Sequence, residues 1–288
     1  MRKSLRTHWA VLTAAGLLLL AILIGIASFI DTGESTATRI ARTGVIRIGY
    51  AVEAPFAFED EKGRVTGESP EVARAIWQQL GIQRIEWVRT DFASLIPQLC
   101  AGRFDQIASG LFIRPERQKL VAFTSPSLCL APALLVRRGN HLGLHSYRDI
   151  ALHEGVRLAV LNRAVEQEEA KHAGVPTERI IAYPNVELAL QAIRNGLADG
   201  LSLSVPTIRH LAATNADMQQ ALPFEATYTL SGCGAFAFRK NDEKLRQQFN
   251  QALRTFLGTP EHLQFLHPLG LDAGDLPAAS DFHRREND

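Results

Sequence analysis

Residues 44–58 read GVIRIGYAVEAPFAF, a short β-branched run that is bounded by glycines and followed by a loop with one acid and two aromatic residues. The run at 45–49 predicts a buried strand. Residues 69–71 then supply an N-cap serine, a first-turn proline and an early glutamate, which predict a helix that ends at Gly81. The segment therefore predicts one strand–helix unit.

The same alternation continues along the chain. Further strands are expected at 85–88, 105–108, 134–136, 157–161, 179–183, 201–203 and 235–238, and helices at 92–100, 115–121, 146–153, 165–172, 185–193, 205–213 and 242–257. Repeated units of this kind predict an α/β architecture with mostly parallel sheets. Two series of units, broken near residue 137 and rejoined near residue 232, predict two lobes joined by two crossing hinge strands. Ligands of open α/β sheets bind beyond the carboxyl ends of strands, so the cleft between the lobes is the expected site.

The predicted organisation follows from these boundaries. Residues 1–38 form a signal peptide or an N-terminal membrane anchor, 39–136 the first part of lobe 1, 137–231 lobe 2, and 232–288 the return to lobe 1 with a C-terminal tail. The hinge is expected near 136–139 and 231–235.

The N-terminus carries an export signal. Three basic residues within the first six precede an uncharged apolar run at 9–30. Cleavage after Ala27 or Ala37 is one interpretation, and a retained anchor with its basic end in the cytoplasm is the other. Both place the rest of the chain in the periplasm, either free or tethered to the inner membrane by residues 9–30. No cysteine follows the apolar run, so a lipoprotein is not expected.

Composition excludes several classes of function. The chain has 31 basic and 30 acidic residues, of which the first 38 positions hold three and two, so the remainder has no net formal charge and no nucleic-acid partner is expected. No phosphate-binding or dinucleotide fingerprint is present. His141 and His145 lie in a glycine-rich loop without an acid at metal-ligand spacing. We therefore expect no cofactor and no metal, and we expect a monomer.

Three cysteines are present, at positions 100, 129 and 233. An exported compartment permits disulfides, but three cysteines cannot all pair, and their spacing does not select a pair. We interpret them as small buried apolar residues.

Five segments in order then give the chain a recognisable pattern. They are GVIRIGYAVEAPFAF (44–58), VTGESPEVARAI (65–76), FASLIPQLCAGRFDQIASGL (92–111), RPERQKLVAFTSP (114–126) and ELALQAIRNGLADG (187–200). Over residues 42–260 the chain resembles the extracellular solute-binding proteins of family 3, which serve polar amino-acid uptake, and within them the ectoine and hydroxyectoine binders. The resemblance implies a type II periplasmic-binding-protein fold, a small zwitterionic ligand and an ABC transporter permease as partner.

Arg117 is the first residue to which the resemblance gives a role, that of gripping the ligand carboxylate. A planar guanidinium suits this task because it can donate two parallel hydrogen bonds to a carboxylate. The alternative is an exposed arginine that pairs with a surface acid such as Glu116.

Three phenylalanines follow three of the expected lobe 1 strands, namely Phe56, Phe92 and Phe112. As a set they predict an aromatic box for a diffuse cation, although each alone is more typical of a core. By resemblance to ectoine binders, Glu53 pairs with the amidinium charge of the ligand, and its alternative is a solvated loop residue. Gly110, two residues before Phe112, completes the lobe 1 set.

The lobe 2 positions depart from the pattern of amino-acid binders. Where those proteins often have a hydroxyl residue that opens the helix after the 157–161 strand, this chain has Asn162, Arg163 and Ala164, and we include Ala164 in the site. Asn162 is a candidate helix cap, and Arg163 is either a second cation or a surface residue. Ser204 stands where the resemblance places an aspartate that receives an α-ammonium, which argues against a plain α-amino acid; its alternative role is an N-cap.

Two further functions remain as alternatives. A periplasmic dehydratase of the cyclohexadienyl or prephenate type would share the fold and need a general acid, for which Glu53 and Glu68 are candidates. A sensory module tethered by the N-terminal segment is the other. We expect a transport receptor rather than an enzyme.

Overall fold

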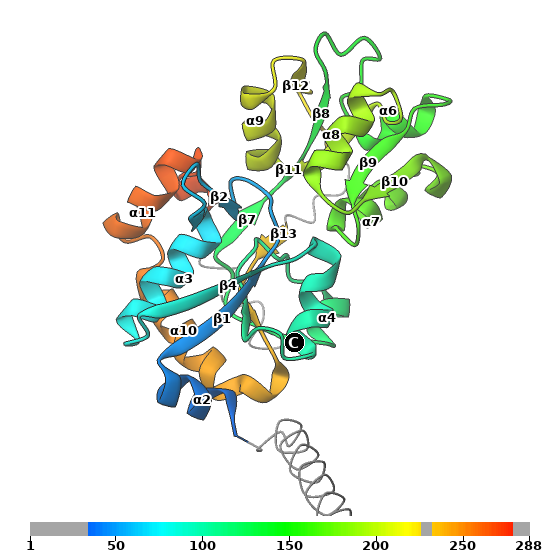
Figure 1. Cartoon of the computed structure of the whole chain (residues 1–288). Coiled ribbons are helices and arrows are strands. Elements are labelled where there is room, and N and C mark those ends of the chain that lie inside the picture. The colour runs from blue at the N-terminus through cyan, green and yellow to red at the C-terminus, as the bar shows by residue number, and fades with distance from the viewer. Residues whose placement is uncertain (1–33, 226–231, 279–288) are drawn as a thin grey trace, which may run out of the picture.

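Two five-stranded mixed sheets form the framework of the computed structural model, which describes residues 34–225 and 232–278 (Figure 1). The first has the order β4 (Arg84–Arg89), β1 (Val45–Tyr50), β5 (Gln106–Ile107), β14 (Ala237–Phe238) and β6 (Ala122–Phe123). The second has the order β10 (Ile180–Tyr183), β9 (Leu158–Leu161), β11 (Gly200–Ser204), β8 (Pro132–Arg137) and β12 (Met218–Gln220). The two-lobed α/β fold predicted from the sequence is confirmed.

The sheets are mixed, where the sequence pattern predicted mostly parallel ones. In each lobe the strands of the strand–helix units pair in parallel, as β1 does with β4 and β5, and β9 with β10 and β11. The strands β14, β8 and β12 pair in antiparallel fashion. The difference arises because β8 and β14 enter their sheets from the crossing segments and run against the strands beside them.

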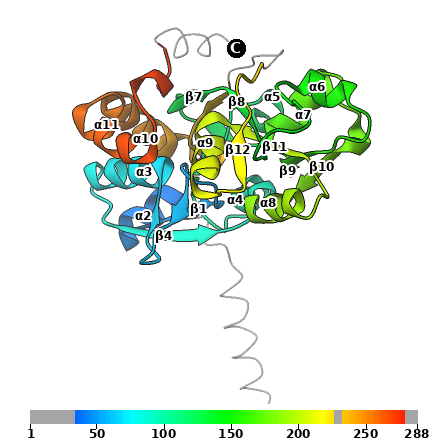
Figure 2. The same ribbon diagram turned by 90° about the horizontal axis from the view of Figure 1, so that it is seen from above.

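Helices cover both faces of each sheet. Figure 2 shows the two lobes side by side, with α3, α10 and α11 of lobe 1 at the left and α6 and α7 of lobe 2 at the right. In the described residues they are α2 (Thr36–Thr43), α3 (Glu68–Gln79), α4 (Leu95–Cys100), α5 (Pro115–Gln118), α6 (Tyr147–Leu152), α7 (Val165–His172), α8 (Val186–Arg194), α9 (Val205–Thr214), α10 (Glu243–Phe256) and α11 (Pro260–Leu266). Successive side chains of β8 point to opposite faces of the second sheet. Leu135 packs with α8 and α9 on one face, whereas Leu134 and Val136 pack with α6 and α7 on the other.

Two antiparallel strands cross between the lobes, β7 (Leu128–Leu130) and β13 (Gly232–Gly234). Because β8 already pairs in the second sheet, we place the first passage at Ala131 rather than at residue 137. Cys129 and Cys233 lie opposite each other in this pair and form a disulfide. The interpretation of three small buried apolar cysteines is therefore wrong for these two, and it is wrong for Cys100, which is exposed.

The N-terminal helix α2 contains Ala37, one of the two predicted cleavage sites, so folded lobe 1 begins before that site. Ser35 caps α2, and the Thr36 hydroxyl accepts a hydrogen bond from Arg239, so cleavage after Ala37 would remove its cap and first residues. Residues 9–30 and the Ala27 site lie outside the described residues, so cleavage and tethering stay predictions. In the part of the chain that the structure describes, no helix combines the length and apolar character needed to cross a membrane.

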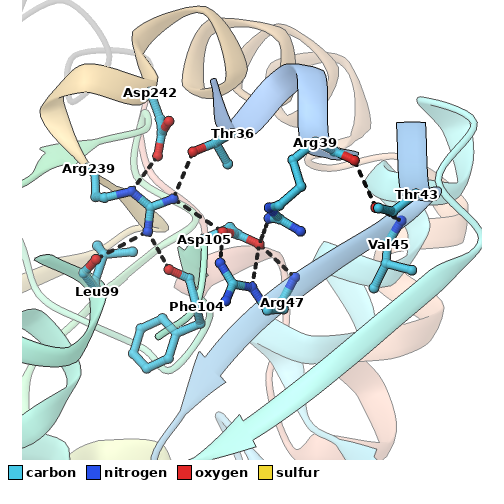
Figure 3. A network of polar contacts seen from close by, with 10 residues as sticks. All are labelled: Thr36, Arg39, Thr43, Val45, Arg47, Leu99, Phe104, Asp105, Arg239 and Asp242. Atoms are coloured by element: carbon cyan, nitrogen blue, oxygen red, sulfur yellow. Dashed lines mark hydrogen bonds and ion pairs between the residues drawn. The ribbon is translucent and has the colours of Figure 1, made fainter. Parts of the chain in front are cut away.

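A buried aspartate ties the ends of lobe 1 together (Figure 3). The fully buried Asp105 forms ion pairs with Arg39 of α2 at 2.5 Å, Arg47 of β1 at 2.9 Å and Arg239, beyond β14, at 3.2 Å. Burial raises the pKa of Asp105, but the hydrogen bonds and charge of Arg47 and the charge of Arg39 outweigh it and leave the pKa below its ordinary value. The ionised carboxylate therefore stabilises the fold, and this contribution is lost as the pH falls below about 4.

Replacing Asp105 tests whether its ion pairs with Arg39, Arg47 and Arg239 stabilise lobe 1. Asp105→Asn should lower the free energy of unfolding by about 3–5 kcal/mol, because it removes the buried charge that three partly exposed guanidinium groups share, and among the described residues only Arg239 keeps another acidic partner, Asp242. Urea unfolding at pH 7 measures the change. Asp217→Asn is the matched control, since Asp217 pairs with Arg194 at the surface and its loss should cost less than about 1 kcal/mol. Equal effects of the two substitutions would contradict the assignment.

Candidate ligand-binding site

One pocket lies between the lobes and contains all eight residues predicted from the sequence. It encloses about 330 Å³ of space free of atoms, counted out to its opening. Its lining consists of Glu53, Phe56, Phe92, Gly110, Phe112, Arg117, Ala164, Val165, Glu166, Leu203 and Ser204. The structure thus brings the predicted set together, and the part each residue plays toward a ligand stays a prediction.

A tight turn after β1 places the first two of these residues. The Glu53 carbonyl accepts hydrogen bonds from the backbone N–H groups of Phe56 and Ala57, at 2.9 and 3.0 Å. Gly110 lies against this turn with φ +58°, and a Cβ there would come within 2.9 Å of Phe56 Cγ. Both the backbone conformation and the close approach therefore require glycine at position 110.

Phe112 is held by the crossing strand β13. The segment around it bonds to this strand on both sides, from Ala235 N–H to the Leu111 carbonyl at 3.0 Å and from Ile113 N–H to the Cys233 carbonyl at 2.9 Å. A Cβ on Gly232 would lie 2.2 Å from the Phe112 ring. The ring therefore occupies space that only glycine leaves free in the hinge.

Arg117, from the short helix α5, reaches across the cleft. Its Nη1 donates to the Phe112 carbonyl and its Nη2 to the Arg163 carbonyl of lobe 2, both at 2.7 Å. Among the described residues these bonds use two of the five N–H donors of the guanidinium, which leaves others for an anion. Burial lowers the pKa of Arg117 to about 10, so the side chain stays charged at neutral pH. The alternative of an arginine that pairs with a surface acid is not what the structure shows.

The three phenylalanines do not form a symmetrical box. Phe56 and Phe112 are buried and pack in one cluster with Leu266 and Leu271 from the C-terminal region. Phe92 is half-buried and contacts the apolar cores of both lobes. The Arg117 guanidinium lies over its ring, 5.4 Å from the centroid, so a cation of the protein already contacts one face of Phe92.

Glu53 receives a hydrogen bond from lobe 2. Thr207 Oγ1 donates to Glu53 Oε1 at 2.9 Å, and the same hydroxyl lies 3.2 Å from Ser204 Oγ. Ser204 does occupy the N-cap position of α9, but its side chain makes no capping hydrogen bond. Burial, and then the charge of Glu166, raises the pKa of Glu53 to about 7, while Thr207 acts in the opposite direction. Glu53 is therefore not a solvated loop residue.

Sequence reasoning missed the second carboxylate of the pocket, Glu166. It lies in the first turn of α7, two residues beyond Ala164, and only 5% of its surface is exposed. Burial raises its pKa to about 7, against the lowering effect of Arg117 and Arg114. One sequence signal could have identified it. Glu166 follows soon after the carboxyl end of β9, where ligands of open α/β sheets bind. The predicted site included only Ala164 of the 162–164 segment before it, where related binding proteins often have a hydroxyl residue. Val165, Leu203 and Thr207 were also missed.

The 162–164 segment itself contributes backbone. Ala164 is the N-cap residue of α7 without a side-chain cap, so Asn162 does not cap this helix. Arg163 is exposed and has φ +61°, and it turns its carbonyl, not its charge, toward Arg117. Its surface interpretation is the one that the structure supports.

Glu68, a candidate general acid, lies outside the pocket lining. It is fully buried in lobe 1, and its Oε2 accepts a hydrogen bond from Ser69 Oγ at 2.6 Å. The same Ser69 oxygen accepts from Gly110 N–H at 3.1 Å. Glu68 therefore supports the pocket wall from behind and has no access to a reacting group.

A second cavity continues the cleft. It holds about 350 Å³ and shares Glu53 and Phe92 with the first pocket. Its other lining residues are Ala51, Val52, Arg89, Thr90, Asp91, Leu161, Pro184 and Asn185. The described residues contain no group of three or more histidine, cysteine or acidic side chains placed to hold a metal ion.

An ion pair outside the pocket joins the two lobes. Arg114, just before α5, contacts Glu169 of α7 at 3.0 Å, and the two side chains are 18% and 5% exposed. Burial, and then the charge of Glu166, raises the pKa of Glu169 to about 7. Since one partner belongs to each lobe, the pair exists only when the lobes are together.

Comparisons with known proteins agree with this arrangement. The model of the bacterial extracellular solute-binding proteins, family 3, matches residues 46–262. A probable amino-acid ABC transporter periplasmic-binding protein of Sinorhizobium fredii is 34% identical over 88% of this chain and 86% of its own. The crystal structure of EhuB in complex with hydroxyectoine is 34% identical, with a TM-score of 0.76 over 83% of this chain and 93% of that one. An ancestral amino acid-binding protein, described as a precursor of cyclohexadienyl dehydratase, is 28% identical, with a TM-score of 0.73 over 82% and 99%.

The ion pair between Arg114 and Glu169 provides a test of how the two lobes are held together. Glu169→Gln should shift the protein toward an open form, because the amide no longer neutralises Arg114 in the buried interface. We expect a larger radius of gyration by small-angle X-ray scattering and a ligand affinity lower by about tenfold. Glu168→Gln on the same helix is the control, since Glu168 is 64% exposed and pairs only with Lys171. An unchanged scattering profile for Glu169→Gln would show that the pair does not hold the lobes together.

Proposed function

The chain belongs to the bacterial extracellular solute-binding proteins of family 3, and we propose that it captures a small zwitterionic solute in the periplasm and presents it to an ABC uptake transporter. Ectoine and hydroxyectoine are the first candidates and a polar amino acid the next. The observation that carries the proposal is the pocket between the lobes, which combines the Arg117 guanidinium, the Glu53 carboxylate and phenyl rings in one small volume.

The chemistry of a zwitterion fits these groups. The free N–H donors of Arg117 offer a two-pronged bond to a ligand carboxylate, which is stronger where water is excluded. The Glu53 carboxylate offers a buried acceptor for the positive part, and Phe56 and Phe112 offer apolar and π surface beside it. A buried carboxylate with a raised pKa is unfavourable in the empty pocket, and a ligand cation would relieve this cost.

Two considerations favour an ectoine-like solute over a plain α-amino acid. The EhuB structure, which shares the fold and a third of the sequence, holds hydroxyectoine. Ser204 supplies no carboxylate at the position where the resemblance places an aspartate in amino-acid binders. Glu166, however, brings a carboxylate into the pocket from the same lobe, so amino acids belong in any ligand panel.

Transport, not catalysis, is the role of this chain, because its relatives are binding proteins of ABC transporters. The dehydratase alternative loses one of its two candidate acids, since Glu68 does not reach the pocket. Cross-cleft bonds from Thr207 to Glu53 and from Arg117 to Arg163 describe a closed form, and a hinge at β7 and β13 would open it. We propose the closed, monomeric form as the one that docks on the permease.

A ligand panel on the wild type tests the proposal. Ectoine and hydroxyectoine should raise the melting temperature most in a thermal-shift assay, since a ligand that binds only the folded form stabilises it. L-Arginine, L-histidine, L-glutamine and glycine betaine complete the panel. A response to none of these solutes would contradict the proposed ligand class.

The role of Arg117 is tested with the ligand that gives the largest shift. Arg117→Ala should lower its affinity at least about 100-fold, because two charge-assisted hydrogen bonds are lost. Arg148→Ala, at an exposed position of α6, is the control and should bind as the wild type does. Titration calorimetry measures the affinity of both variants for this ligand. If Arg117→Ala binds it as tightly as Arg148→Ala does, Arg117 does not bind the ligand carboxylate.

Phe112 is tested by a change that keeps an apolar side chain and removes the ring. Phe112→Leu should weaken binding of a cation-bearing ligand by about 3- to 30-fold, which corresponds to a desolvated cation–π contact. Phe265→Leu, in the lobe 1 core, controls for a general loss of packing. If both leucine variants bind equally well, the ring of Phe112 contributes no cation–π contact.

A further inference from the structure

Glu166 is the buried charged group of the pocket that the proposed function leaves without a role. It lines the pocket together with Glu53 and Arg117. Glu53 comes from lobe 1, after β1, and Glu166 from lobe 2, at the start of α7. The pocket therefore has one carboxylate from each lobe, whereas the sequence pattern led us to expect only the first.

The carboxylate of Glu166 has acceptor capacity to spare. Among the described residues no other side chain donates a hydrogen bond to it, and the contact it makes is with its own backbone N–H. Only 5% of its surface is exposed, and because it lines the pocket, a ligand there can reach its carboxylate. A buried acceptor left in this state costs free energy unless a partner arrives.

Charged and titratable neighbours surround Glu166 from several elements. Arg117 and Arg114 face it from α5 and the residue before it, Glu169 from α7, Glu53 from the turn after β1, and Tyr147 from α6. Arg114 is already paired with Glu169. The other charged groups that line the pocket are the Arg117 guanidinium and the carboxylates of Glu53 and Glu166. With both carboxylates ionised, the pocket has a net charge of minus one.

We propose that Glu166 is a specificity-determining residue that, together with Glu53, selects ligands whose cation carries N–H donors for both carboxylates. The inference rests on the proposed function and narrows its ligand class. Amidinium, guanidinium and primary ammonium groups meet the requirement, because each offers at least two N–H bonds. A fully alkylated ammonium has none, so Glu166 would gain no donor from it and Glu53 would keep only the hydrogen bond from Thr207.

The proposal also explains why Glu166 is tolerated in the empty protein. Its pKa in the folded chain is raised to about 7 from an ordinary 4.5, so the folded state holds a proton that the unfolded state has released. Stability contributed by this group therefore falls as pH rises from about 4.5 to 7.

Titration calorimetry of Glu166→Gln provides the test, with ectoine, L-arginine and glycine betaine as probes. In the wild type the two probes with N–H donors should bind more tightly than glycine betaine. Glu166→Gln should weaken their binding about 10- to 100-fold, as expected for a lost charged acceptor, and change glycine betaine binding less than about twofold. Glu168→Gln, two residues away on the surface, should change none of the three.

Two additional measurements separate recognition from folding. Glu166→Asp keeps the charge with a shorter reach and should recover part of the lost affinity. In the ligand-free state, Glu166→Gln should raise the melting temperature by about 2–5 °C at pH 8 and hardly change it at pH 5. A merely structural role of Glu166 would lower the melting temperature at both pH values.

The outcomes are distinct from those of the proposed function. Wild-type binding of ectoine or L-arginine that Glu166→Gln leaves within twofold overturns the role of Glu166 and keeps the proposed function. Equal losses for all three probes, or preferred binding of glycine betaine by the wild type, also overturn it. A wild type that binds none of the probes refutes the proposed ligand class, and this inference with it, before any variant is made.

Discussion

The pairing of the crossing strand β13 on both of its edges is the constraint on which the pocket depends. One edge pairs with β7 and is fixed by the disulfide from Cys129 to Cys233. The other bonds to residues 111–113, so the backbone that displays Phe112 and leads to Arg117 is attached to the hinge itself. A rotation of the lobes about these strands would therefore move lobe 2 against a fixed lobe 1 wall. The ligand-facing groups of lobe 1 can be pre-organised while the cleft still opens.

Closure in this molecule relies on polar contacts that are satisfied only when the lobes meet. Arg117 donates to a lobe 2 carbonyl, Thr207 to Glu53, and Arg114 pairs with Glu169. Opposing them are three carboxylates whose pKa values are raised to about 7, the partly buried Glu53 and the buried Glu166 and Glu169. A ligand shifts the equilibrium between open and closed forms only by its difference in affinity for the two, so these opposing terms set how large that difference has to be.

The sequence was sufficient for the fold and for most of the pocket, since strand–helix alternation and the positions after strand ends are local signals. It was insufficient where a residue's role depends on a partner that is distant in the sequence. Cys129 and Cys233 are 104 residues apart, and only the crossing of β7 and β13 brings them together. The sequence pattern predicts no helix beyond residue 257, yet α11 lies there and its Leu266 packs in one cluster with Phe56 and Phe112. Glu166 looks like an ordinary first-turn acid of a surface helix until the fold shows that lobe 1 covers it.

Aromatic residues illustrate why a correct set of residues does not fix a mechanism. The sequence grouped three phenylalanines as a cage for a ligand cation, and all three do line the pocket. In the structure the Arg117 guanidinium lies over Phe92, so this ring contacts the side chain that we propose as the anion-binding group. For the proposed ligand cation the pocket then offers Phe56, Phe112 and two carboxylates. A cage of aromatic faces alone would accept alkylated ammonium groups as readily as protonated ones. Two buried carboxylates require hydrogen-bond donors, and selectivity at this end then depends on N–H groups rather than on charge alone.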